Sequence, residues 1–222
     1  MFGILTYFRK QFHHEPELYD ITGHADLLFS SFKDIGIPNP DFQYLFREHK
    51  ENPESVDQDS AHLLYYLSKM IHASVAIEVG IYRGAGSLHL AQALSENGGG
   101  ELHLVDISSD YLKNVSHKLA EQKYDVKVKM HTGYSNDEKI IKKLPQADII
   151  FIDADHSLAA VRQDVENYWP LVKSNGVLVI HDTVMWPGAR TVANELCSKG
   201  FAITTLATNG GAGISIVRNT HV

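Results

Sequence analysis

Apolar, strand-length runs alternate with amphipathic helical patterns from Val75 onward, and this alternation constrains the fold more than any other feature of the sequence. Five runs have the character of strands, at 75–80, 101–107, 126–132, 147–153 and 176–182. Helical patterns lie between and after them, near 84–95, 109–122, 135–143, 157–169 and 188–199. Apolar strands separated by helices predict a parallel sheet covered by helices on both faces. The expected fold class is therefore α/β and doubly wound.

The C-terminal region departs from this rhythm. Residues 201–208 and 213–219 are rich in β-branched side chains, and Asn209-Gly210-Gly211 lies between them. Such a pattern predicts a hairpin with a tight turn. Because the strands of a hairpin are antiparallel, the last strand should run against an otherwise parallel sheet. Common dinucleotide-binding folds do not end in this way.

Residues 1–56 differ from the rest of the chain and are expected to form a segment apart from a compact domain at 57–222. They are rich in aromatic residues and histidine, and four prolines divide them into short pieces, of which 25–35 and 42–49 suit short helices. A longer helix should follow, capped by Asp57 or Asp59, because apolar residues recur at helical spacing up to Ile71.

Composition excludes several classes of protein. The chain has 222 residues and a net charge of −7, which disfavours a protein that grips nucleic acid. Its one cysteine, Cys197, cannot form an internal disulfide and suits buried packing. No segment approaches the roughly 20 apolar residues that a membrane helix needs. The sequence therefore predicts a cytoplasmic location, with no membrane partner.

The loop after the first predicted strand runs from Glu78 to Ser87 and then opens a helix. Its glycines, Gly80, Gly84 and Gly86, allow close approach of a ligand, and the helix N-terminus offers free N–H groups. Tyr82 occupies the place of the second glycine of a nicotinamide-binding loop. A carboxylate at the strand end would repel a pyrophosphate but accept from an ammonium or hydroxyl group. The alternative is a glycine turn that serves only chain reversal.

The next two strand ends carry groups suited to a nucleoside. Asp106 lies 20 residues beyond Gly86, a distance at which an acid can accept hydrogen bonds from a ribose diol. The third strand ends in Gly133, Tyr134 and Ser135, a turn that could hold an adenine edge. Taken alone, an acid at this position is more often a helix cap, and Ser108 and Ser109 offer alternative caps.

The fourth and fifth strands end in acidic and imidazole groups that should converge. Asp153 and Asp182 could share a hard divalent cation through oxygen ligands. His156 could remove a hydroxyl proton near neutral pH. The sequence favours structural roles for two neighbours, Asp155 as a helix cap and His181 as a satisfied core histidine.

In these residues and their order the sequence resembles the class I S-adenosylmethionine-dependent methyltransferases, from about Val75 to Arg218. Within them it is most similar to the O-methyltransferases of the catechol and caffeoyl-CoA type and to those of natural-product sugars. The resemblance implies a Rossmann-like, seven-stranded sheet of order 3-2-1-4-5-7-6 with strand 7 antiparallel. It also implies an N-terminal helical cap over the substrate, and often a homodimer.

The resemblance further implies roles for individual residues. The loop from Glu78 through Gly80, Tyr82, Gly84 and Gly86 to Ser87 would cradle the methionine part of S-adenosylmethionine. Asp106 would hold the ribose, and Gly133, Tyr134, Ser135 and Asp153 would complete the cofactor site. Asp153 and Asp182 would bind magnesium, with Asp153 and His156 as the catalytic residues.

One departure from the family concerns the metal. The metal-dependent relatives continue Asp-Asp or Asp-Asn after the fifth strand, whereas this chain has Asp182-Thr183. A threonine hydroxyl is a poorer, neutral ligand, so a weak site, a site completed by water and no site remain open.

The expected activity is methyl transfer to a hydroxyl group of a small molecule, of sugar, phenol or natural-product type. Three alternatives stay open. They are a methyltransferase-like binding module without catalysis, a nicotinamide-dependent oxidoreductase, and a nucleic-acid methyltransferase, which charge and the lack of an Asn/Asp-Pro-Pro-aromatic motif disfavour.

Overall fold

The computed structural model describes residues 17–20, 55–208 and 211–220. Its strands are β1 (Glu17–Asp20), β2 (Val75–Val79), β3 (Gly100–Asp106), β4 (Val126–Thr132), β5 (Ala147–Ile152), β6 (Val172–His181), β7 (Ala202–Ala207) and β8 (Ile214–Arg218). Its helices are α4 (Gln58–Met70), α5 (Ala85–Glu96), α6 (Ser109–Gln122), α7 (Glu138–Ile141), α8 (Leu158–Tyr168) and α9 (Pro187–Ser198), with a 3₁₀ turn, η2 (Trp169–Leu171). The predicted alternation is confirmed, although α7 is shorter than expected and β6 begins four residues before Gly176.

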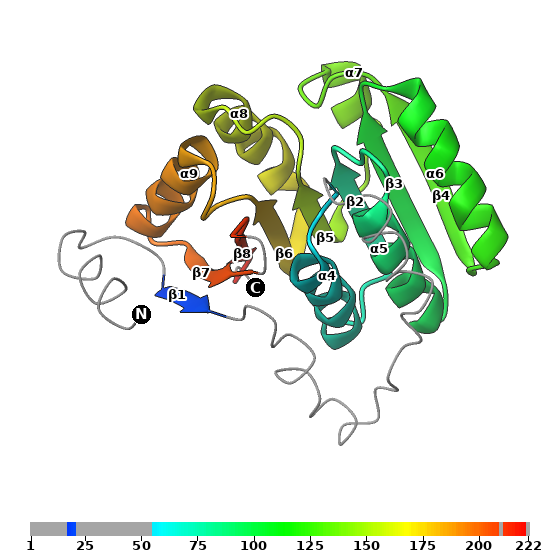
Figure 1. Ribbon diagram of the computed structural model, residues 1–222, viewed down its shortest axis with the longest axis horizontal. Coiled ribbons are helices and arrows are strands. Elements are labelled where there is room, and N and C mark those ends of the chain that lie inside the picture. Colours follow the sequence, from blue (N-terminus) through cyan, green and yellow to red (C-terminus); the bar gives the residue numbers. More distant parts are fainter. Residues whose placement is uncertain (1–16, 21–54, 209–210, 221–222) are drawn as a thin grey trace.

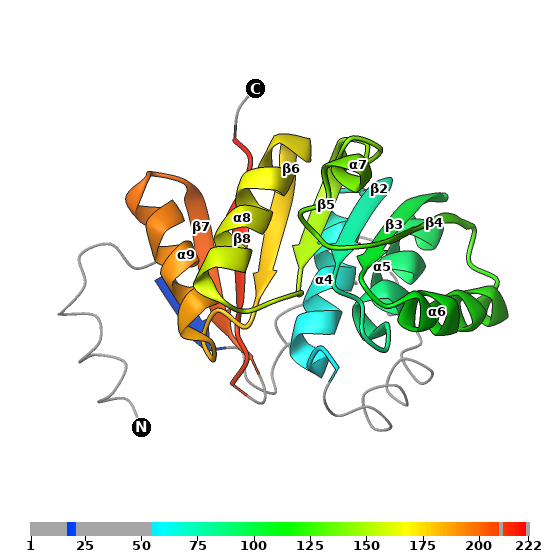
Figure 2. The same cartoon turned by 90° about the horizontal axis from the view of Figure 1, so that it is seen from above.

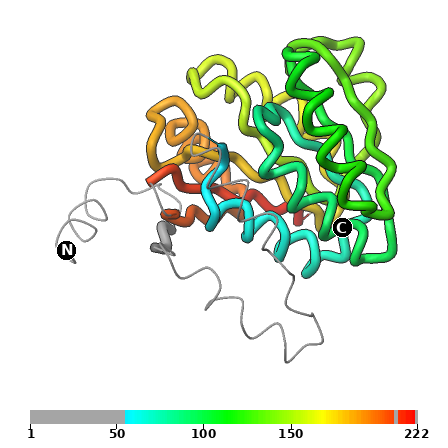
Figure 3. Tube along the Cα trace, turned by 45° about the vertical axis from the view of Figure 1, so that its right-hand side comes forward, coloured from blue at the N-terminus to red at the C-terminus, as the bar shows by residue number. Residues whose placement is uncertain are grey.

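All the strands join one sheet, in the order β1-β7-β8-β6-β5-β2-β3-β4 (Figure 1). Counted from β2, this is the predicted order 3-2-1-4-5-7-6. Strand β8 runs antiparallel to both β6 and β7, whereas the other pairs are parallel. In Figure 3 the red C-terminal strand lies among the orange and yellow segments of β7 and β6. The closing hairpin thus inserts its last strand into the sheet.

The N-terminal segment, for which the resemblance implies a helical cap, contributes a strand to the sheet. Glu17–Asp20 pairs in parallel with β7 and extends the sheet beyond the predicted seven strands. Without it, one edge of β7 would present unpaired N–H and C=O groups. The short helices expected near 25–35 and 42–49 lie outside the described residues.

Helices cover both faces of the sheet because successive strand residues point to opposite sides. Ile149 and Phe151 pack with α4, α5 and α6, while Ile150 and Ile152 pack with α8 and α9. Figures 1 and 2 show these two helical layers. No described helix combines the length and the apolar character that a bilayer crossing demands.

The sheet changes direction of winding between β2 and β5, since β2 pairs with both β3 and β5. Ligands of doubly wound sheets bind beyond the carboxyl ends of the strands at such a switch point. Gly80, directly after β2, has φ +82°, and a side chain there would collide with the Asp153 carbonyl after β5. This contact brings the loops after β2 and β5 together and places the two predicted parts of the site side by side.

Candidate active site

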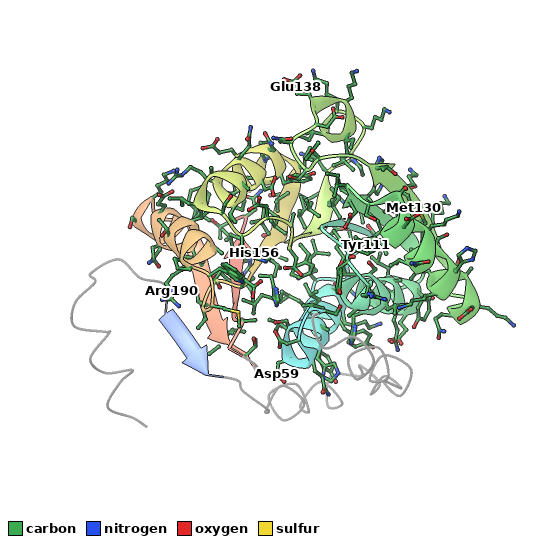
Figure 4. All side chains as sticks on the ribbon, turned by 45° about the horizontal axis from the view of Figure 1, so that its top comes forward. Asp59, Tyr111, Met130, Glu138, His156 and Arg190 are labelled. Carbon is green, nitrogen blue, oxygen red and sulfur yellow. The ribbon has the colours of Figure 1, made fainter. Side chains whose placement is uncertain are left out.

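Two adjoining cavities lie at this end of the sheet. The first has a volume of about 770 Å³ and lies among the loops after β2, β3, β4 and β5. The second, of about 660 Å³, extends toward the start of α4 and the end of β6. Both are lined by Tyr82, Asp153, Ala154, His156 and Trp186. His156 and Tyr111, which lines the first cavity, are labelled in the central part of Figure 4.

Glu78 is a buried carboxyl at the boundary of the second cavity. It is 2% exposed, and the Ser87 hydroxyl donates to it. Burial raises the pKa of Glu78 well above its usual value, and the Ser87 bond only partly offsets this. A Cβ atom at position 86 would collide with the Glu78 carboxyl group. The carboxyl group therefore faces a space that only a glycine leaves free.

Asp106 is held rigidly at the wall of the first cavity. The backbone N–H of Ile81 donates to its Oδ2 at 2.9 Å, and the N–H of Ser108 donates to its Oδ1 at 2.7 Å. These bonds tie the end of β3 to the loop after β2. Ser108, not Asp106, caps α6, because its hydroxyl accepts from Tyr111 N–H.

The loop after β4 supplies Gly133, Tyr134 and Ser135 to the first cavity. Gly133 N–H donates to the Asp106 carbonyl at 2.9 Å, and the Tyr168 hydroxyl donates to the Ser135 carbonyl at 2.9 Å. Both bonds fix the loop next to Asp106. Tyr134 is 68% exposed at the rim.

Two predicted cofactor residues, both within the described part of the chain, line neither cavity. Gly84 adopts φ +86° as the N-cap of α5, where a Cβ would collide with Val115. Ser87 is fully buried and its hydroxyl is used by Glu78. Gly84 therefore shapes the turn, and Ser87 orients Glu78.

Asp153, His156 and Asp182 converge as the sequence predicts. The His156 Nε2 atom lies 2.6 Å from Asp182 Oδ2 and 3.5 Å from Asp153 Oδ1. These two carboxylates raise the pKa of His156 to about 9. His156 in this arrangement is therefore a cation at neutral pH, and it can accept a proton only after losing its own.

Asp182 is both buried and conformationally unusual. Its φ of 60° lies in the left-handed region, which a non-glycine residue adopts at a cost. Burial alone would raise the pKa of its carboxyl, but hydrogen bonds to His156 and His181 outweigh burial and lower that pKa. The charged carboxylate is thus held in place at the end of β6.

His181 is buried and satisfied, as predicted for a core histidine, but its partners are the acids of the site. Its Nδ1 lies 3.0 Å from Asp153 Oδ1 and 3.6 Å from Asp182 Oδ2. Its Nε2 lies 3.3 Å from Asp57 Oδ2. His181 is 6% exposed and lines the second cavity. Its position between three carboxylates gives it a place in the site that the sequence analysis did not assign.

Asp57 is the other residue of this group that sequence reasoning missed. It caps α4 as predicted, since its carboxylate accepts from Ser60 N–H at 3.1 Å. Its Oδ2 also accepts from the Thr208 hydroxyl at 3.0 Å and faces His181. The capping pattern gave no sign of a partner 124 residues away in the sequence.

The residues next to His156 and Asp182 behave differently from one another. Asp155 accepts from Ser157 N–H at 2.7 Å and supports the start of α8, whose N-cap is Ser157 itself. Thr183 is 2% exposed, and its hydroxyl accepts from Ser215 at 2.9 Å. The Thr183 side chain therefore points into the sheet. Trp186, left out of the sequence-based site, stacks on His156 with ring centroids 5.4 Å apart and is 48% exposed.

A divalent cation has a plausible set of donors here. One carboxylate oxygen each from Asp153 and Asp182 and one His181 ring nitrogen all lie within 4.8 Å of one another. These three atoms are close enough to converge on a single ion. The set contains two oxygens and one nitrogen, whereas Mg²⁺ prefers oxygen ligands alone.

Comparison with known proteins agrees with this geometry. A family model described as a methyltransferase domain matches residues 77–183. No curated protein matches the sequence significantly.

Solved structures share the fold at low sequence identity. An O-methyltransferase of Streptomyces achromogenes, TomG, which takes part in tomaymycin synthesis and was solved with S-adenosylmethionine, gives a TM-score of 0.64 at 18% identity, over 90% of this chain and 99% of that one. A methyltransferase of Geobacter sulfurreducens gives 0.64 at 19% identity, over 88% and 98%. An O-methyltransferase of Bacillus cereus, solved with S-adenosylhomocysteine, gives 0.62 at 18% identity, over 87% and 97%.

Residues 77–183 thus match a methyltransferase-domain model, and the strand order is the one predicted, so the predicted fold is confirmed.

Proposed function

We propose that the protein transfers the methyl group of S-adenosylmethionine to a hydroxyl group of a small molecule. The observation that carries this proposal is the junction of the two cavities at Asp153 and His156. A cofactor in the first cavity and an acceptor in the second would meet beside an acid and an imidazole. Structural similarity to O-methyltransferases supports the same reaction.

The cofactor site follows from the polar groups of the first cavity and its border. Asp106 accepts from the ribose hydroxyls, and the loop of Gly133, Tyr134 and Ser135 lies along the adenine. The loop from Glu78 to Gly86 takes the methionine part, whose ammonium group is a suitable partner for the Glu78 carboxyl. Gly80 and Tyr82, which line the first cavity, complete the wall.

The reaction is an in-line displacement in which a bond forms between the acceptor oxygen and the methyl carbon as the bond from that carbon to sulfur breaks. The hydroxyl proton goes to the neutral imidazole of His156. Asp153 and Asp182 orient the imidazole, and Trp186 stacks against it. Alignment of the acceptor and removal of its proton are the contributions of this chain.

A divalent cation, expected to be Mg²⁺ from the resemblance, would be held by Asp153 and Asp182. When bound, such an ion supplies Lewis acidity that makes an acceptor hydroxyl easier to deprotonate. It would also balance the carboxylate charge that keeps His156 protonated. His156 would then be available as a base nearer to neutral pH.

The second cavity fits a small acceptor with an apolar body and a hydroxyl group. Tyr82, Met185 and Trp186 supply apolar surface, and the polar groups gather at Asp153, His156 and Asp182. Phenols and hydroxylated natural products of that size meet this description, and a sugar would meet it only through the C–H face of its ring.

The test is substitution of His156 by alanine, with His117→Ala as the matched control on the exposed face of α6. His156→Ala should keep its affinity for S-adenosylhomocysteine and lower turnover of a hydroxylated acceptor by about 10²–10⁴. His117→Ala should change neither. Unchanged turnover in His156→Ala would remove this residue from the mechanism.

The remaining expectations are also part of the proposal. We infer a division between residues 1–56 and 57–222, which is supported by the start of α4 at Gln58. We also propose that the protein is cytoplasmic, that it forms a homodimer and that it binds no nucleic acid. Sedimentation of the full chain, with and without a duplex oligonucleotide, tests the last two.

A further inference from the structure

The resemblance implies a metal ligand directly after Asp182, but the side chain at that position is not available as an oxygen donor in this chain. The residue after Asp182 is Thr183, whose hydroxyl accepts from Ser215 at 2.9 Å and which is 2% exposed. To coordinate an ion, Thr183 would have to break this bond and leave the sheet interior. A third protein ligand must therefore come from elsewhere.

His181 is the side chain that occupies the right place. Its Nδ1 lies 3.0 Å from Asp153 Oδ1 and 3.6 Å from Asp182 Oδ2, and the three donor atoms fit within one coordination sphere. The ring is buried and packs edge-on against Phe151, with centroids 5.9 Å apart. His181 thus presents one nitrogen to the two carboxylates from a fixed position.

The other nitrogen of His181 has the partner that a metal-bound histidine needs. A ligating histidine almost always donates its second ring N–H to a carboxylate, a carbonyl or water, which fixes its tautomer. His181 Nε2 lies 3.3 Å from Asp57 Oδ2. Asp57 is itself anchored by Ser60 and Thr208. When His181 donates its Nε2–H to Asp57, its Nδ1 atom is left unprotonated. That nitrogen can then bind a cation.

We propose that His181 Nδ1 is the third protein ligand and that the site selects a divalent transition-metal ion such as Co²⁺ or Zn²⁺ over Mg²⁺. Mg²⁺ takes oxygen ligands in near-ideal octahedral geometry, whereas imidazole suits later first-row ions. Asp57 is a positioning residue that acts through His181. The inference concerns the same cavity as the proposed function and rests on it only for the role of the ion in methyl transfer.

The test is calorimetric titration of the chelator-treated full chain with CoCl₂ and, separately, with MgCl₂. Because most sites bind Co²⁺ more tightly than Mg²⁺, the readout is the change in the ratio of the two affinities between variants. His181→Asn should lower the Co²⁺ affinity at least tenfold and leave the Mg²⁺ affinity within about threefold. Asp57→Asn should lower the Co²⁺ affinity by about 10–100-fold, as loss of such partners does elsewhere. The exposed His117→Asn is the control and should change neither.

A second measurement needs no variant that might misfold. The Co²⁺-loaded wild-type chain should give a hyperfine-shifted, exchangeable imidazole N–H resonance from His181. The same resonance should persist in His156→Gln, which separates His181 from the neighbouring imidazole. Absence of the resonance in Co²⁺-bound protein, or an unchanged affinity ratio in folded His181→Asn, overturns the proposal.

Failure of the metal inference and failure of the proposed function can be told apart. Titration with S-adenosylhomocysteine in the same preparations reports the cofactor site without reference to the ion. Nucleoside binding with no imidazole ligation rejects only the metal inference. Imidazole ligation with no nucleoside binding rejects only the proposed methyl transfer.

Discussion

The Nε2 atom of His156 lies 2.6 Å from the Oδ2 atom of Asp182, so that an ion pair joins the loop after β5 to the end of β6. Asp153 lies 3.5 Å from the same nitrogen. The pair gathers the proposed catalytic groups at the junction of the two cavities. The two carboxylates also stabilise the protonated, positively charged form of His156.

The pH dependence of stability follows from this charge. The pKa of His156 is raised from its usual 6.5 to about 9, so the protonated form stabilises the folded chain. That contribution is complete below pH 6.5 and is lost as the pH rises through about 9. His156→Gln should reduce the free energy of unfolding by about 1–3 kcal/mol at pH 6 and by much less at pH 9.5. Urea unfolding in the presence of chelator measures both, and a difference that stays constant with pH would contradict the assignment.

Substitution of Asp106 should weaken cofactor binding and also loosen the loop after β2, because Asn keeps an acceptor oxygen for only one of the Ile81 and Ser108 N–H groups. Hydrogen bonds to a charged group are worth about 1.5–3 kcal/mol, so Asp106→Asn is expected to weaken S-adenosylhomocysteine binding by roughly 10–100-fold. Asp110→Asn, an exposed change in the first turn of α6, is the matched control. Equal affinities for the two variants in calorimetry would mean that Asp106 does not hold the ribose.

Alanine variants at Gly80 and Gly98 distinguish the stability cost of steric collision from that of backbone strain. Both have positive φ, +82° and +105°, but a side chain at Gly80 meets the backbone of Asp153, whereas nothing lies within 4 Å at Gly98. Each Gly→Ala change carries strain of about 1–3 kcal/mol. Gly80→Ala should cost at least about 2 kcal/mol more than Gly98→Ala, because overpacking adds to the strain. Chemical denaturation of the two variants compares them directly, and equal costs would show that the close approach to Asp153 is relaxed.

Thr183 should affect stability and not metal affinity. Its hydroxyl accepts from Ser215, which is also bonded to Thr205. Loss of one buried hydrogen bond in Thr183→Val should cost about 1–2 kcal/mol of unfolding free energy. Its Co²⁺ affinity should stay within about threefold of wild type. A tenfold loss in a titration with CoCl₂ would identify Thr183 as a ligand after all.

The sequence was sufficient for the sheet and for the convergence of the site because both follow from local patterns. Strands alternating with helices determine a parallel sheet, and the residues after each strand necessarily meet at one edge. Asp106, Asp153, His156 and Asp182 were therefore predictable as neighbours. The antiparallel last strand followed from the turn at Asn209.

Other features depend on contacts between distant segments or on the direction of one side chain. Asp57 contacts His181, which lies 124 residues later in the chain. The sequence pattern around Asp57 indicated only a helix cap and gave no reason to expect this contact. The burial of Thr183 depends on where β8 inserts, which places Ser215 beside it. The pairing of Glu17–Asp20 with β7 required a free sheet edge that no local pattern reports.

Calorimetric titration with S-adenosylhomocysteine, with NAD⁺ as the control ligand, tests the central claim most directly. The account predicts saturable binding of S-adenosylhomocysteine at one site per chain, weakened in Asp106→Asn, and no binding of NAD⁺. Folded protein that binds NAD⁺, or that binds neither ligand, would contradict it.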